Sequence, residues 1–291
     1  MASIPVRWVI AASAAVGLCV ASVLVWASLN RASASRGDPW VDAPTAVQAD
    51  HAVVVAELFT SEGCSSCPPA DDVLRRLVHQ PLGGATVLGL GEHVDYWDRL
   101  GWRDGFSSPA FSTRQGEYQA KVFHTGSIYT PQIVIDGRFE AVGSDVVAIR
   151  AAIARATTAP KARIAVEASP EDARHLRVRV RVDAPPAVVR EKADLMVAVT
   201  QDRLTTDVQR GENRGRRLTH SAVVRSLTVL GSFSVPDRTF TTTTTLAVAP
   251  EWNAAELRIV GFLQERESRR IVGAGSVRVD PQSQASKEST R

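Results

Sequence analysis

The sequence predicts an α/β domain, with a mixed sheet flanked by helices and a helical insertion, followed by an all-β, sandwich-like domain. At 291 residues the chain exceeds the usual size of one compact domain, so two domains are expected. Strand-like and helix-like patterns alternate over residues 51–157, which is typical of a sheet covered by helices. From Lys161 onward the helical period disappears, and short strand-like stretches between turn-rich segments indicate an antiparallel sandwich.

The elements of the first domain follow in chain order. The apolar, β-branched run at 51–59 (HAVVVAELF) is typical of a strand covered on both faces. Apolar residues at 73, 74, 77 and 78 form one face of a helix over 71–79. The sequence then predicts a strand over 86–90, a helix over 109–123, a hairpin of strands 132–135 and 138–142 with an Asp-Gly turn, and a helix over 145–157.

The second domain is predicted from seven strand-like stretches, at 162–168, 175–184, 195–202, 220–231, 238–248, 256–265 and 270–279. The domains are therefore expected at 51–160 and 161–280, with a disordered tail over 281–291. The arginine-rich segment GENRGRRLTHSAVVR (211–225) is interpreted as a solvated loop and strand edge rather than an anion site.

The amino terminus has the pattern of an export signal. Residues 8–29 contain no charge and are flanked by Arg7 and Arg31. A helix of this length just spans a hydrocarbon core of roughly 30 Å, while Ala32-x-Ala34 offers a cleavage site, so a cleaved signal peptide and a signal anchor over 1–34 both stay open. After a linker over 35–50, we expect an extracytoplasmic protein, periplasmic or secreted, or anchored in the inner membrane by 8–29 if that run is uncleaved.

Composition and motifs exclude several functions. The formal charge of +3 is too small and too scattered for a nucleic-acid-binding protein. The sequence has no phosphate-binding loop, dinucleotide fingerprint or Ser-His-Asp ordering, so nucleotide and hydrolase chemistry have no support.

Cys64 and Cys67, in the stretch SEGCSSCPPAD, are the only cysteines outside the amino-terminal run. They lie between a predicted strand and a predicted helix, which is expected to place Cys64 at the amino terminus of that helix. Unpaired N–H groups and the helix dipole there lower the pKa of a thiol from about 8.5. A bridge between them closes a loop of about four residues and gains only about 2 kcal/mol of chain entropy, which is little for a structural staple. The pattern predicts a redox dithiol, with an inert disulfide as the alternative.

Four segments of the chain are distinctive: AELFTSEGCSSCPPAD, EHVDYWDRLGWRDGFSSPAFSTRQ, YTPQIVIDG and GENRGRRLTHSAVVR. Together they resemble a family of exported bacterial thioredoxin-like proteins, the DUF1223 type. The resemblance spans residues 52–280 and implies a thioredoxin-like fold for the first domain. It also implies a cis Thr130-Pro131 bond, with the Pro131 loop against the dithiol and the backbone of Thr130 pairing with substrate.

Glu57 is expected to be buried if its strand is central. A buried carboxyl near a dithiol has a raised pKa and can relay the proton of the resolving cysteine. Thioredoxins carry an acid in the corresponding strand, but here one extra residue separates it from the first cysteine. A proton relay and a solvated or locally hydrogen-bonded edge acid therefore both stay open.

His93 follows the predicted strand 86–90, at the sheet edge where the dithiol is expected. Two thiolates and an imidazole suit copper or zinc, so Cys64, Cys67 and His93 offer an alternative function as a copper-binding metallochaperone or assembly factor. The other interpretation of His93 is that it holds the neighbouring insertion to the sheet by hydrogen bonds.

The leading hypothesis is an exported thiol-disulfide oxidoreductase that acts on protein thiols or disulfides, without a cofactor beyond its own disulfide. Cys64 would be the nucleophile and Cys67 the resolving thiol. Ser65 and Ser66 supply no charge to destabilise the disulfide, which favours a reductant or mild exchanger over a strong oxidant, although the direction stays open. A non-catalytic module that binds a partner protein is a further alternative.

Overall fold

The computed structural model describes residues 52–80, 82, 84–185, 187–235 and 237–280, which belong to one compact unit. The expected export signal, the linker over 35–50 and the tail over 281–291 lie outside these residues. Within the described ranges, no helix has both the length and the apolar character needed to cross a membrane.

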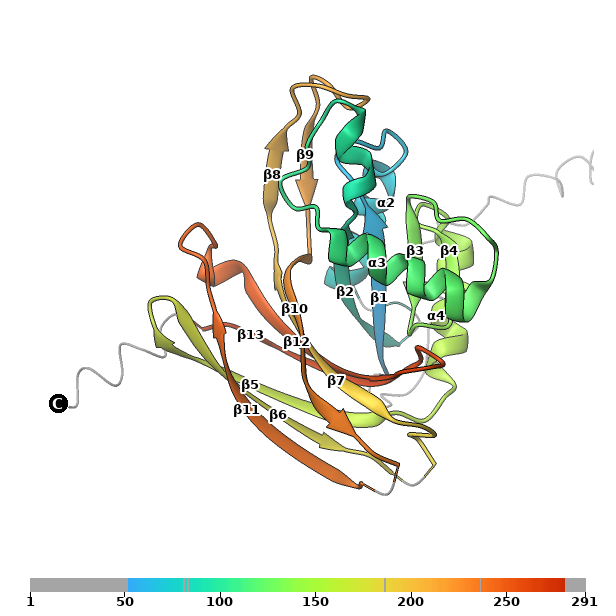
Figure 1. The fold of residues 1–291 in the computed structure, drawn as a ribbon, viewed down its shortest axis with the longest axis vertical. Coiled ribbons are helices and arrows are strands. Elements are labelled where there is room, and N and C mark those ends of the chain that lie inside the picture. The colour runs from blue at the N-terminus through green and yellow to red at the C-terminus, as the bar shows by residue number, and fades with distance from the viewer. Residues whose placement is uncertain (1–51, 81, 83, 186, 236, 281–291) are drawn as a thin grey trace, which may run out of the picture. The chain divides into compact units, whose positions relative to one another are not determined.

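Eleven strands of the described chain form one mixed β-sheet in the order β11-β6-β5-β13-β12-β7-β10-β2-β1-β3-β4, and β8 pairs with β9 separately (Figure 1). The strands are β1 (Ala52–Thr60), β2 (Ala85–His93), β3 (Gln132–Ile135), β4 (Phe139–Val142), β5 (Ala162–Asp172), β6 (His175–Asp183), β7 (Ala193–Gln201), β8 (Leu204–Asp207), β9 (Arg217–His220), β10 (Val223–Phe233), β11 (Thr239–Ala247), β12 (Leu257–Glu265) and β13 (Ile271–Arg278). The helices are α2 (Pro68–His79), α3 (Pro109–Tyr118) and α4 (Val146–Thr157), with 3-10 turns η1 (Asp95–Leu100) and η3 (Ala254–Glu256) and a π-helical turn η2 (Gln119–Phe123).

The sheet runs through both halves of the chain. β10 lies beside β2, where Val223 pairs in parallel with Gly91, and the N–H of Gly91 donates to Ala222 O at 2.8 Å. The prediction of an α/β thioredoxin-like domain with a helical insertion, followed by a sandwich-like domain, is therefore wrong: the described chain is mainly one large mixed sheet with few helices. The domain boundary at residue 160 stays a prediction.

The error arises because sequence periodicity reports on single segments. Periodicity identifies a strand from the side chains of that strand alone. It does not reveal which strands pair, and β2 pairs with β10 through a single residue pair in register. The pairing within the C-terminal half also differs from a purely antiparallel sandwich, because β13 and β5 run parallel. Neither pairing leaves a pattern along the chain.

Most individual elements agree with the sequence. β1 covers Ala52–Thr60 where 51–59 was expected, and all seven strand-like stretches after residue 161 contain a strand. The expected helix over 109–123 is α3 followed by the π-helical turn η2. The sequence analysis missed β8 and β9, which are only four residues long each.

The C-terminal strands curl so that part of the sheet packs against itself. Side chains of β6, β7 and β12 form one core, which includes Val178, Val180, Val197 and Ile259. At Gly261 in β12, an added Cβ would lie only 3.0 Å from Val166 Cγ2 of β5, so these two strands approach face to face. The seven strands thus bury their own apolar side chains while remaining in one sheet.

The two faces of β1 carry different polar groups. Successive side chains of a strand point to opposite faces. Glu57 faces α3, where its carboxylate binds Arg114, whereas Thr60 faces α2 and donates to Asp71 Oδ1 at 2.9 Å. The loop that follows Thr60 carries the two cysteines and continues into α2. The cysteines therefore lie on the α2 side of β1, the side that Thr60 faces.

Candidate dithiol site

Cys64 and Cys67 form a disulfide, with their Cα atoms 5.4 Å apart. Both cysteines are fully buried, whereas Ser65 and Ser66 between them are exposed. The short loop is closed locally by backbone bonds, because the N–H of Cys67 donates to Cys64 O at 3.2 Å. The bond therefore lies in a compact turn whose tip faces solvent while its sulfur atoms do not.

The second cysteine, rather than the first, begins the helix. Cys67 occupies the N-cap of α2, and its carbonyl accepts from the N–H groups of Ala70 (2.8 Å) and Asp71 (3.1 Å). Pro68 and Pro69 fill the first helical positions, where no N–H donor is needed. The sequence analysis had expected Cys64 at this position, and the structure puts Cys64 in the turn just before it.

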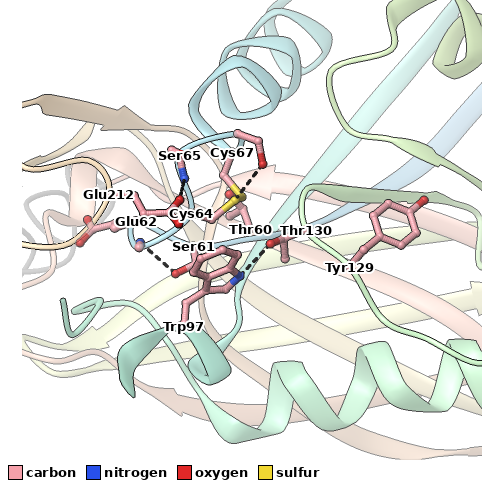
Figure 2. The surroundings of a disulfide bond; sticks show 12 residues. Thr60, Ser61, Glu62, Cys64, Ser65, Cys67, Trp97, Tyr129, Thr130 and Glu212 are labelled. Carbon is pink, nitrogen blue, oxygen red and sulfur yellow. Dashed lines mark hydrogen bonds between the residues drawn. A yellow bond between two sulfur atoms is a disulfide. The ribbon is translucent and has the colours of Figure 1, made fainter. Parts of the chain in front are cut away.

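The Thr130-Pro131 peptide bond is cis, as the family resemblance implied. Thr130 Oγ1 accepts from the indole N–H of Trp97 at 2.8 Å, and both side chains belong to the surroundings of the disulfide (Figure 2). An added Cβ at Gly143 would lie 2.8 Å from Ala70 Cβ and 3.2 Å from Pro131 Cβ. Pro131 thus lies beside the first turn of α2, the helix whose N-cap is Cys67.

The loop between β8 and β9 holds the cysteine turn from the other side. The amide of Asn213 donates to Glu62 O at 2.8 Å and to Cys64 O at 2.9 Å. Arg216 donates to Asn213 Oδ1 at 2.8 Å and so orients this amide, and the exposed Glu212 accepts from the N–H of Ser65 at 2.9 Å. The segment interpreted as a solvated loop is therefore part of the site.

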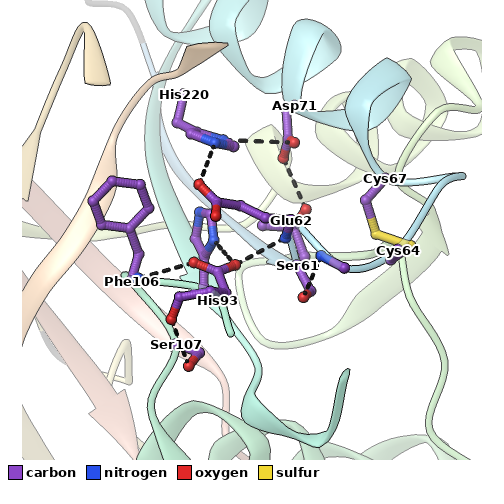
Figure 3. A network of polar contacts seen from close by, with 12 residues as sticks. Ser61, Glu62, Cys64, Cys67, Asp71, His93, Phe106, Ser107 and His220 are labelled. Atoms are coloured by element: carbon purple, nitrogen blue, oxygen red, sulfur yellow. Dashed lines mark hydrogen bonds and ion pairs between the residues drawn. A yellow bond between two sulfur atoms is a disulfide. The ribbon is translucent and has the colours of Figure 1, made fainter. Parts of the chain in front are cut away.

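Buried ionisable side chains surround the same turn (Figure 3). They are Glu62, Asp71, His93, Asp104 and His220, each less than a tenth exposed. Asp104 Oδ2 lies 2.7 Å from His93 Nδ1 and accepts from the N–H of Glu62 at 2.8 Å. His220 Nε2 lies 3.2 Å from Glu62 Oε1, and its Nδ1 lies 3.7 Å from Asp71 Oδ2. The network therefore reaches from the cysteine turn to β2 and β9.

The ionisable groups of this network have pKa values shifted in different directions. Burial favours a neutral His93, but the charge of Asp104 and their hydrogen bond outweigh burial and raise the pKa of His93. The pKa of Asp104 is lowered, because His93 and two backbone N–H groups outweigh the effect of burial. Asp71 differs: burial raises its pKa, and the neighbouring histidines do not cancel that effect. Of the two aspartates in this group, Asp71 is thus the one that more readily carries a proton.

Glu57 lies on the opposite face of β1. Its carboxylate accepts from Arg114 Nε at 3.0 Å, from the second Arg114 nitrogen at 2.8 Å and from the hydroxyl of Tyr118 at 2.8 Å. This is a buried ion pair with α3, so Glu57 is neither solvated nor on the Thr60 side of the strand. A relay from Glu57 to the dithiol stays a prediction, and Asp71 is the acid on the dithiol side that sequence reasoning missed.

Glu92 is a second buried acid on the Glu57 side. Its carboxyl oxygens have no hydrogen-bond partner among the described residues, and Arg114 Nε lies 3.5 Å from Oε1. Burial, reinforced by the charge of Glu57, raises the pKa of Glu92 to about 8. Glu92 therefore holds a proton over much of the neutral pH range.

The part of the chain that the structure describes contains no assembled metal site. No group of three or more His, Cys, Asp or Glu side chains there is arranged to hold an ion. His93 Nδ1 is already paired with Asp104, and the ring packs edge-to-face on Phe106 and His220 at 5.4 and 5.0 Å. The copper alternative stays an untested prediction.

Two solved structures resemble the chain over 79% of its length. A crystal structure of an Agrobacterium tumefaciens protein has 30% sequence identity and a TM-score of 0.61, over 96% of that protein. HBP35 of Porphyromonas gingivalis has 16% identity and a TM-score of 0.60, over 76% of that protein, and shows a likeness of fold alone. The chain has no match among curated proteins. A family model described as "Protein of unknown function (DUF1223)" matches residues 55–264.

Proposed function

The chain belongs to this family of DUF1223 proteins, and we propose that it is a thiol-disulfide oxidoreductase with Cys64 and Cys67 as its reaction centre. The observation that carries the proposal is the Cys64–Cys67 disulfide itself, closed over two residues at the N-cap of α2. A loop this short contributes only about 2 kcal/mol to stability, so structural bracing is a weak reason for the bond. Helix N-termini stabilise thiolates, which are the reacting form in disulfide exchange.

In the reductive direction the exchange takes two steps. The Cys64 thiolate attacks one sulfur of a substrate disulfide, so the substrate's S–S bond breaks and a mixed disulfide forms. The Cys67 thiolate then attacks Cys64 Sγ, which releases the second substrate thiolate and forms the Cys64–Cys67 disulfide. Two electrons pass to the substrate, and an external dithiol returns the protein to its reduced form.

Asp71 is the proposed proton acceptor for the second step. Cys67 must lose its proton before it attacks. Asp71 lies one helical turn further along α2, and its backbone N–H donates a hydrogen bond to the carbonyl of Cys67. A carboxyl with a raised pKa is a better proton acceptor than an ordinary aspartate. The hydrogen bond from Thr60 fixes its orientation.

Access to the sulfur atoms requires a local opening. Both cysteines are fully buried, and the amide of Asn213 and the indole of Trp97 lie over the turn. An added Cβ at Gly63 would lie 3.2 Å from Trp97 Cβ, so Trp97 packs directly on this loop. In the proposed cycle a substrate protein displaces these groups before it meets Cys64. The amino-terminal apolar run supports an extracytoplasmic location for this reaction.

Trapping the mixed disulfide tests the proposal. Cys19 is replaced by Ser in every variant, so that Cys64 and Cys67 are the only thiols. Reduced Cys67→Ser protein is mixed with oxidised insulin, and we expect a covalent adduct on non-reducing gels, because the resolving step is blocked. Cys64→Ser is the matched control and should give no adduct, and the Cys19→Ser parent should reduce insulin with turnover. Failure of the parent to reduce insulin, together with equal trapping by both variants, would refute a catalytic pair.

A further inference from the structure

A cavity of about 530 Å³ lies between α3, the loop before it and the strand β10. Its wall combines polar side chains with an apolar part formed by Phe106, Phe111, Met196, Val224, Leu227 and Val229. This volume falls within the range of small-molecule sites, which are usually apolar with a few polar groups that orient the ligand. Val229 is half exposed at the edge of the cavity, whereas Phe111 and Val224 are buried in its wall.

Arg225 is the charged side chain of this cavity that two aromatic rings hold, rather than an ion pair. Its guanidinium lies 5.2 Å from the ring centroids of both Phe106 and Trp252, so two aromatic rings hold it in place. Among the described residues it has neither a hydrogen bond nor an ion pair, although it is half-buried. Burial lowers the pKa of Arg225, opposed by the charge of the nearby Glu251.

The other two charged side chains that line the cavity are already paired. Arg114 binds Glu57 at 2.8 Å, and Glu117 binds Arg269 at 2.9 Å. A half-buried cation that makes no hydrogen bond or ion pair costs free energy that an anionic ligand would recover, since charge-assisted hydrogen bonds to guanidinium are among the strongest in proteins. The free charge of this cavity is therefore positive and lies at Arg225.

We propose that this cavity binds an amphipathic monocarboxylate, with its acid group on Arg225 and its apolar body against Phe111, Met196 and Leu227. Arg225 supplies a planar donor pair that matches a carboxylate, and its two stacked rings preorganise it. The apolar wall selects a ligand with an alkyl or aryl body over a small polar acid. The site goes beyond the dithiol reaction and does not depend on it.

Calorimetric titration with decanoate, below its micelle concentration, tests this site on the oxidised full chain. We expect one decanoate per chain, bound at least about tenfold more tightly than decan-1-ol, because the alcohol lacks the charge that Arg225 recognises. Arg225→Gln should weaken decanoate binding by about tenfold and leave the affinity for decan-1-ol unchanged. Arg225→Lys, which keeps the positive charge, should reduce decanoate affinity by less.

Two further variants keep the test decisive if Arg225→Gln folds poorly. Val229→Asp adds an acid at the exposed edge of the cavity. It should weaken the binding of decanoate but not the binding of decan-1-ol. Glu251→Gln removes the acid that competes for Arg225 and should tighten decanoate binding. The proposal is overturned if decanoate does not bind, if decan-1-ol binds as tightly, or if neither Arg225→Gln nor Val229→Asp changes decanoate affinity. Because no step uses the dithiol, an inert disulfide would leave these outcomes unaffected.

Discussion

Asp71 and Glu57 are buried acids close to β1 that lie on opposite faces of the sheet. The sequence analysis selected Glu57, because thioredoxins carry an acid in the corresponding strand, although one residue closer to the first cysteine, whereas the structure pairs Glu57 with Arg114. Asp71 sits on the cysteine side, in the first turn of α2. Its neighbour Asp72 is exposed, and nothing in the pattern PPADD distinguishes which aspartate points inward.

Asp71→Asn should slow the resolving step. The amide keeps the size of the side chain but cannot accept the proton of Cys67, so release of the mixed disulfide should fall about a hundredfold. The first attack by Cys64 should change much less. Because a carboxyl must be ionised to accept a proton, the resolving rate of the parent should fall as pH drops through the raised pKa of Asp71, and this fall should be absent in the variant. Stopped-flow measurement of each step checks this, with Asp72→Asn as the matched control. Equal rates for Asp71→Asn and the parent at every pH would exclude the relay.

Glu92 makes stability depend on pH. Its pKa is about 8 in the folded protein and near 4.5 in the unfolded chain, so between these values the folded state binds more protons. The free energy of unfolding should therefore fall as pH rises from about 4.5 to about 8. Glu92→Gln should flatten this fall.

Urea unfolding at a series of pH values measures that slope. Glu167→Gln, which removes an exposed acid from β5, is the matched control and should leave the slope unchanged. If Glu92→Gln and the control show the same slope as the parent, the raised pKa of Glu92 does not govern stability in this range.

The β8–β9 loop is the element that sequence reasoning understood least. Strands of four residues are too short to show a clear alternation, and the function of the loop depends on the bond from Asn213 to Cys64, 149 residues away in the chain. The elements with longer patterns, such as α2 and β1, were predicted within a few residues. Local patterns therefore identified the cysteine turn, but not the segment that covers it.

Asn213→Ala should open the site. The variant removes two hydrogen bonds to the cysteine turn, each contributing about 1 kcal/mol, so reduction of the disulfide by dithiothreitol should accelerate by up to about thirtyfold. The nearby exposed Arg214 provides the control, and Arg214→Ala should react like the parent. A rate for Asn213→Ala no faster than that of Arg214→Ala would show that this loop does not limit access.

The two halves of the described chain share a core as well as a sheet. Val55, Leu90 and Phe111 of the first half pack with Val224 and Phe262 of the second. Arg114 also donates to Gln264 Oε1 at 3.0 Å across this joint. Such contacts between distant segments depend on the assembled fold, which is why correct single elements led to an incorrect fold class.

This shared core predicts cooperative unfolding. Tryptophan fluorescence and far-UV circular dichroism should give coincident urea transitions, because neither half can lose its structure without exposing the common apolar surface. Two separate transitions would instead support independent domains at 51–160 and 161–280.

The central claim is that Cys64 and Cys67 form an exchangeable dithiol rather than a structural bridge. Its most direct test is the reduction potential of the pair, measured by equilibrating the full chain in glutathione and dithiothreitol buffers. We predict a value between about −270 and −180 mV, the range of reducing and isomerising dithiol proteins. A value below about −300 mV, typical of structural disulfides in secreted proteins, would contradict the account.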